Sequence, residues 1–180
     1  MSVTAQMVKE LRERTGAGVM DAKRALEAAD GDMERAAALL REQGLARAER
    51  KAGRATLQGV VEAYVHGGGR IGVLIEVNCE TDFVARTPEF RDLAHDLAMQ
   101  VAATAPRYVS VEEVPEQELL SGASAAGSKE QFLEQVVLLA QPFIKDPSRT
   151  IEDVVKEAIA RFGENIRVRR FSRFELGVDS

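Results

Sequence analysis

The chain contains one cysteine, two histidines and no apolar run of the ~18 residues that a membrane span needs. A single cysteine, Cys79, cannot close an intramolecular disulfide, which agrees with a reducing compartment. The histidines, His66 and His95, lack the spacing of a helical metal site, so we expect no metal and no cofactor. The charged N-terminal segment has no apolar targeting core, which predicts a cytoplasmic protein that does not bind membranes.

Positive charge is scarce in the larger part of the chain. Residues 1–54 carry 11 Lys and Arg against 9 Asp and Glu, whereas residues 55–180 carry 13 against 20. Because nucleic-acid binding requires a basic surface, we expect a protein partner and no direct nucleic-acid contact. The basic segment 47–54 lacks aromatic residues that would stack on bases. A solvated linker or a helix extension is therefore favoured over an RNA-binding arm.

Three short helices are predicted in residues 1–43. Thr4 can cap the first helix, the second covers about Val19–Ala29, and the third begins after Asp32 and is expected to stop at Gly44. These helices contain few large apolar residues and predict a small core. A docking module is therefore favoured over an enzyme.

Strand patterns dominate the next part of the chain. The runs 57–66 and 71–77 flank three glycines at 67–69, which predicts an antiparallel hairpin. The run 166–176 alternates with a period of two, which places Val168 and Phe174 on the same face of a third strand.

Helical patterns separate these strands. Thr87 is expected to cap a helix at Pro88–Thr104, and Thr150 with Asp153 resembles a capping box. The Gly/Ala/Ser run 121–128 is interpreted as a flexible connection. The predicted fold is α+β: an N-terminal three-helix domain at residues 1–54, then a core at 55–180 with a three-stranded antiparallel sheet and helices on one face.

Phe83 and Asp82 follow directly behind an apolar strand and precede the Thr87 helix start. Loop positions of this kind often meet a partner. Phe83 could instead plug the junction between strand and helix, and Asp82 could be a local turn or cap residue. The acidic neighbours Glu80 and Asp82 oppose thiolate formation at Cys79, so a catalytic cysteine is not expected.

Four separated motifs, in order along the chain, resemble bacterial elongation factor Ts. They are Leu11–Leu26, Val77–Ala85, Gln141–Asp146 and Gly163–Phe171. The similarity extends from about residue 3 to Gly177.

The resemblance implies a guanine nucleotide exchange factor for elongation factor Tu, and so a protein that is not an enzyme. In the family the first domain is ubiquitin-associated-like and docks on the GTPase, and a phenylalanine enters near the nucleotide and magnesium site. The corresponding positions here are Arg12, Val19, Met20, Thr81, Asp82, Phe83 and Val84, with Val19 in place of the commoner methionine. A non-catalytic adaptor that binds through the three-helix module is the alternative.

Long members of the family contain a second half of the core and a coiled-coil hairpin, and neither pattern occurs in this chain. Short members form homodimers, so the resemblance implies a two-fold dimer with the last strand as an interface. Ser172 stands where some short relatives have cysteine, which excludes a disulfide at that position.

Overall fold

The computed structural model describes residues 3–178. The chain divides into two compact units, residues 1–53 with 156–164 and residues 54–155 with 165–180. The first contains the N-terminal helices and the second contains a three-stranded antiparallel sheet with a packed helical layer. This confirms the predicted α+β class.

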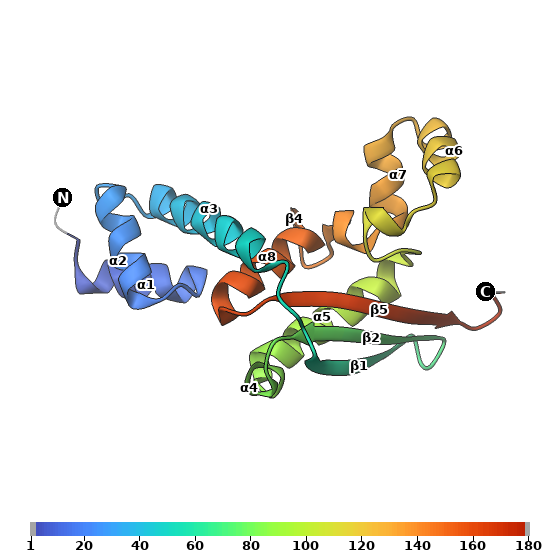
Figure 1. Cartoon of the computed structure of the whole chain (residues 1–180), viewed down its shortest axis with the longest axis horizontal. Helices are drawn as coiled ribbons and strands as arrows, with labels where there is room; N and C mark the ends of the chain where they lie inside the picture. The colour runs from blue at the N-terminus through green and yellow to red at the C-terminus, as the bar shows by residue number, and fades with distance from the viewer. Residues whose placement is uncertain (1–2, 179–180) are drawn as a thin grey trace. The chain divides into compact units, whose positions relative to one another are not determined.

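The first unit begins with helices α1 (Ala5–Thr15), α2 (Val19–Ala28) and α3 (Met33–Lys51) (Figure 1). Thr4 caps α1 as predicted, because its hydroxyl accepts a hydrogen bond from the Met7 amide at 3.2 Å. The side chains that fill the small core between the helices are Leu11, Ala22, Ala25, Leu26, Ala29 and Ala36.

The predicted stop at Gly44 is wrong, since α3 continues for almost two more turns. Gly44 is buried, and a Cβ atom at this position would lie 3.1 Å from the Cβ of Ala160 in helix α8 (Ile151–Phe162). The glycine therefore serves a close packing contact within the helix and does not end it. Most of the basic segment 47–54 is accordingly a helix extension.

The sheet of the second unit has the order β1 (Gln58–His66), β2 (Ile71–Cys79) and β5 (Ile166–Glu175), all antiparallel (Figure 1). The hairpin prediction is confirmed, with all three glycines of the turn at positive φ. Helix α5 (Pro88–Thr104) packs against β1 and β2. The buried apolar residues of β2, α5 and β5 include Val73, Ile75, Val77, Phe90, Leu93, Ala94, Leu97, Val101, Ile166 and Val168.

A β-bulge reverses the predicted alternation of β5. Val77 pairs with Val168 but its neighbour Glu76 pairs with Arg170, so Arg169 is the extra residue. Beyond the bulge each side chain changes face. Phe174 is consequently 68% exposed and does not share the buried face of Val168, which corrects the simple period-two assignment.

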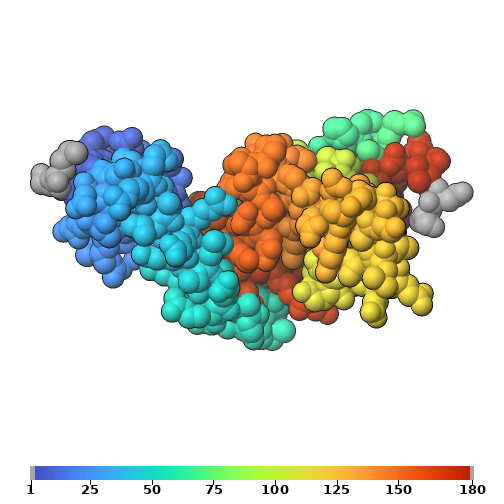
Figure 2. Space-filling view, turned by 90° about the horizontal axis from the view of Figure 1, so that it is seen from above, coloured from blue at the N-terminus to red at the C-terminus, as the bar shows by residue number. Residues whose placement is uncertain are grey.

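Residues 121–128 are not a flexible connection. They lie largely in helix α6 (Glu116–Ala126), which packs against α7 (Lys129–Val136), and the two form a continuous yellow surface in Figure 2. Gly122 makes this packing possible, because a Cβ there would approach the Phe132 ring to 2.2 Å. A sequence rich in small residues thus forms a closely packed helix here.

The remaining elements are short, and a buried amide network ties one of them, β3, to α5. They are η1 (Val111–Glu113), η2 (Leu138–Ala140), β3 (Pro142–Phe143) and β4 (Asp146–Thr150). The fully buried Gln100 of α5 donates to the carbonyl of Pro142 at 3.1 Å and accepts from the amide of Ile144 at 2.9 Å.

Helix α8 begins with the predicted capping box. The Thr150 amide donates to the Asp153 carboxylate, and the Asp153 amide donates to the Thr150 hydroxyl, both at 3.1 Å. The reciprocal pair satisfies two amides at the start of the helix.

Candidate partner-binding site

Phe83 projects from a single helical turn, α4 (Asp82–Ala85), that follows β2. Its side chain is 82% exposed, whereas Ala85 in the same turn is only 6% exposed. The plug interpretation of Phe83 is therefore wrong, because a ring that filled the junction between strand and helix would be buried. An apolar ring of this size in water is available to a partner.

Threonine caps fix the turn on both sides. The Thr81 hydroxyl accepts a hydrogen bond from the Val84 amide at 3.4 Å. Thr87 donates its hydroxyl proton to the Val84 carbonyl at 2.8 Å and accepts from the Phe90 amide at 3.2 Å. Because Val84 is held from both directions, the backbone that carries Phe83 is tied to the start of α5.

Asp82 has a local partner. Its carboxylate lies 2.9 Å from the guanidinium of Arg86, one turn later, and both side chains are well exposed. A solvent-exposed pair of this kind contributes little to stability, about 0.2–1 kcal/mol. Little free energy is therefore lost if the Asp82 carboxylate leaves Arg86 to contact another molecule.

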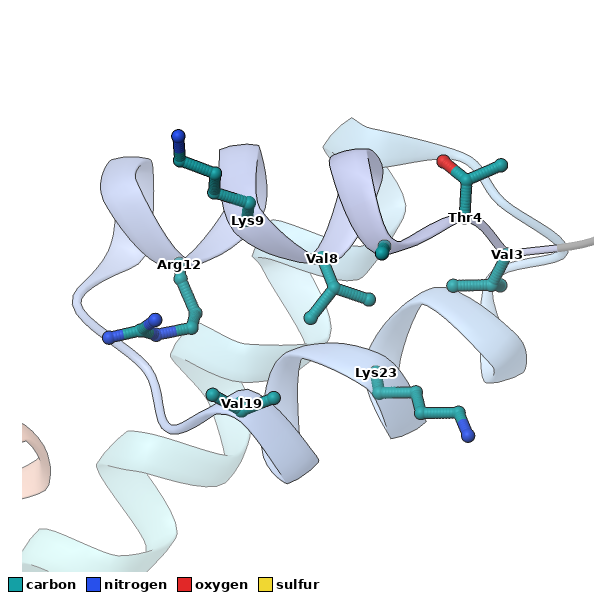
Figure 3. Close-up of a pocket in the computed structure, with 8 residues that line it drawn as sticks. Val3, Thr4, Val8, Lys9, Arg12, Val19 and Lys23 are labelled. Carbon is teal, nitrogen blue, oxygen red and sulfur yellow. The ribbon is translucent and has the colours of Figure 1, made fainter.

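The N-terminal residues Arg12, Val19 and Met20 are all exposed, and the fractions for Val19 and Met20 are 52% and 62%. Met20 is therefore not a filler of the small helical core. Arg12 and Val19 line a groove of about 380 Å³ between α1 and α2 (Figure 3). The other residues of the groove are Val3, Thr4, Ala5, Val8, Lys9 and Lys23.

The groove combines an apolar floor with a positively charged margin. In Figure 3 Val8 points from α1 toward α2, and Arg12 and Val19 lie together at one end. Lys9 and Lys23 were not among the predicted site residues, although Lys23 follows Val19 by four positions and so shares its helix face. The groove suits an apolar side chain with acidic neighbours.

Asp21 holds the beginning of α2 in place. Its carboxylate accepts hydrogen bonds from Arg47 of α3 at 3.0 Å and from Arg24 at 2.5 Å. The hydrogen bond from Arg47 is the main reason that the pKa of Asp21 lies below its usual value, and Arg24 adds to the effect. The ion pairs orient the helix end that displays Val19 and Met20.

The two groups of predicted site residues lie in different units, with Arg12, Val19 and Met20 in the first and Thr81–Val84 in the second. Within residues 3–178 we find neither a cluster of three or more His, Cys, Asp or Glu side chains placed to hold a metal ion nor a helix with the length and hydropathy to span a membrane.

The chain is similar to known proteins along almost all of its length. A family model described as Elongation factor TS matches residues 20–126 and 123–178. Elongation factor Ts of Carboxydothermus hydrogenoformans is 56% identical over 194 residues, covering 97% of this chain and 89% of that protein. The proteins of the same name from Heliobacterium modesticaldum and Coprothermobacter proteolyticus are 54% and 48% identical, over 97% and 98% of this chain and 90% and 100% of those proteins.

Proposed function

The chain belongs to the elongation factor Ts family, and we propose on this basis that it is a guanine nucleotide exchange factor. Its partner would be elongation factor Tu, in the GDP-bound and nucleotide-free states, and its role would be GDP release during translation elongation in the cytoplasm. Exchange makes and breaks no covalent bond. It requires only that the factor bind the opened GTPase better than the closed one.

Phe83 is the proposed wedge, with Asp82 beside it, and the observation that carries this assignment is its 82% exposure on a capped turn. Insertion of the ring near the nucleotide and magnesium site would bury it, which is worth about 1.5–3 kcal/mol. A ring that is already displayed on a fixed backbone loses little conformational entropy on insertion.

The wedge alone is not sufficient. A thousandfold acceleration of GDP release requires about 4 kcal/mol, at ~1.4 kcal/mol for each factor of ten. We propose that residues 1–54 form a docking domain that supplies part of the remainder through Arg12, Val19 and Met20, and that residues 55–180 form the core. By linkage, the factor and the nucleotide then weaken each other's binding to the GTPase by the same factor.

Release of a fluorescent GDP analogue from elongation factor Tu, followed by stopped flow, tests the exchange function. We expect the release rate to rise with the concentration of this protein and to level off at about a thousandfold above the spontaneous rate. An adaptor would bind the GTPase without changing the rate, which a parallel pull-down would reveal. No binding to either nucleotide state would contradict the exchange function.

We further propose that the chain forms a homodimer through the open face of its sheet. The register places the side chains of β1, β2 and β5 that face away from α5 in adjacent rows, with Gly72 between Val65 and Phe174. The exposed apolar residues of this face are Val61, Val65, Leu74 and Phe174, and Leu176 and Val178 continue beyond β5. An apolar face of this kind on an antiparallel sheet is stabilised when a second layer covers it.

Leu74→Glu is expected to shift the protein from dimer to monomer, because Leu74 belongs to the central strand of that face and a charge there would be buried without a partner. Light scattering during gel filtration measures the mass directly. Leu120→Glu is the matched control, since Leu120 is 69% exposed on α6. A wild-type monomer at micromolar concentration, or an unchanged dimer in the Leu74 variant, would rule out this interface.

A further inference from the structure

Glu80 ties the start of the Phe83 turn to a distant part of the same unit. Its carboxylate accepts a hydrogen bond from the backbone amide of Asn165 at 2.6 Å, across 85 positions of sequence. The Glu80 side chain is 23% exposed. A short hydrogen bond to a carboxylate that is mostly shielded from water is among the stronger kinds in a protein.

Asn165 is itself fixed. It is 5% exposed, and its side-chain amide donates to the carbonyl of Arg54 at 2.8 Å. The guanidinium of Arg54 in turn lies 3.5 Å from the Glu80 carboxylate. Arg54, Glu80 and Asn165 therefore form a closed ring of contacts, which we call the Glu80 clamp.

The clamp acts at one end of the segment that displays Phe83. On one side of Glu80, Cys79 pairs with Ile166 in the sheet. On the other side of Glu80, Thr81 caps the turn that carries the ring. The Thr81 carbonyl accepts a hydrogen bond from the Cys79 thiol at 3.2 Å, which joins the two sides. Rotation of the chain at Glu80 would change the direction in which the turn, and with it Phe83, leaves the sheet.

We propose that Glu80 is a positioning residue for Phe83, which acts by holding the ring in the direction required for insertion. The proposal rests on the exchange function proposed above, and it adds a residue outside the turn itself. A clamp formed before the partner arrives lowers the entropy lost on insertion, so its benefit appears in the step where the ring enters.

Nucleotide-release kinetics separate this role from general binding. Glu80→Ala and Glu80→Asp, which is one methylene shorter, are expected to slow release at saturating factor by about tenfold, equivalent to ~1.4 kcal/mol. The half-saturating concentration should change by less than about twofold. Glu80→Gln retains an acceptor for the Asn165 amide and should stay near wild type. Glu134→Ala, an exposed glutamate of α7, is the matched control.

A double-mutant cycle with Phe83→Ala isolates the coupling between the two side chains. If Glu80 acts through the ring, Glu80→Asp should slow release by less than about twofold when Phe83 is already alanine. The positioning role would be overturned if Glu80→Asp slowed release equally with phenylalanine and with alanine at position 83. It would also be overturned if Glu80→Asp had no effect in either background while Phe83→Ala alone slowed release. If Phe83→Ala itself has no effect, the wedge function fails instead, so the two failures are distinguishable.

The free protein offers a second readout that does not depend on exchange. The chain contains no tryptophan, so Phe83→Trp introduces a single fluorescent reporter on the turn. In that background Glu80→Asp should increase the amplitude of the fast local decay of fluorescence anisotropy, and Glu80→Gln should not. Unchanged anisotropy in Glu80→Asp would contradict the clamp, and circular dichroism establishes that each variant is folded.

Discussion

Phe83→Ala is expected to slow the release of GDP from elongation factor Tu by about 10- to 100-fold. This range corresponds to the loss of ~1.5–3 kcal/mol of ring burial. The effect should appear at saturating factor, because the ring would act in the opened complex and not in the first encounter. Stopped-flow release of a fluorescent GDP analogue gives the rate, and titration calorimetry with nucleotide-free GTPase gives the affinity.

The folded state should not change in this variant, since Phe83 is 82% exposed and supports no core contact of the described chain. Leu120→Ala removes a comparably exposed apolar side chain from α6 and serves as the control. A release rate for Phe83→Ala within about twofold of wild type, less than ~0.5 kcal/mol, would show that the wedge assignment is wrong.

Gln100→Leu is expected to lower the free energy of unfolding by about 1–3 kcal/mol, the cost of a buried polar group that loses its partner, because the two backbone groups that Gln100 binds are only partly buried. The substitution leaves the amide of Ile144 and the carbonyl of Pro142 without the side chain that now binds them. It also removes a 3.3 Å hydrogen bond to Gln141, which is itself 2% exposed. Urea denaturation followed by circular dichroism measures the loss.

Gln117→Leu provides the comparison for that experiment. Gln117 is an exposed residue of α6, so the same chemical change removes no buried hydrogen bond. It should stay within about 0.5 kcal/mol of wild type, as surface substitutions usually do. Equal stability of Gln100→Leu and the native protein would mean that the amide network contributes nothing net.

Local signals made much of the fold predictable. The caps at Thr4 and Thr87, the glycine turn at 67–69 and the Thr150 capping box all act within a few residues, and the structure has each of them where the sequence indicates. Such signals are reliable because the partner of each group is fixed by the backbone geometry of one turn.

Features that depend on distant packing were not predictable in the same way. Gly44 and Gly122 suggest helix breaks when the sequence alone is considered, but each permits close contact with a side chain of another helix, Ala160 and Phe132 respectively. The bulge at Arg169 is likewise visible only in the pairing with β2. In each case a tertiary contact overrides the local preference of the residue.

The candidate site shows the same division. The strand that ends before Phe83 and the cap that follows it allowed either a displayed ring or a ring buried at the junction, and the exposure of Phe83 decides for the displayed ring. The Glu80 clamp depends on a hydrogen bond from Asn165, and no sequence pattern near Glu80 or near Asn165 indicates that the two residues meet. The spacing of Val19 and Lys23 could have suggested the groove margin, but the opposite wall depends on how α1 packs.

Cys79 is fully enclosed, and its thiol proton is directed at the Thr81 carbonyl. Cysteines placed by mutagenesis on the outside of the molecule would therefore react with maleimide dyes well before the native sulfur does. This makes the chain suited to site-specific labelling for energy-transfer measurements without removal of its own cysteine. The slow rate at which the Cys79 thiol is modified would in turn measure how often the end of β2 opens.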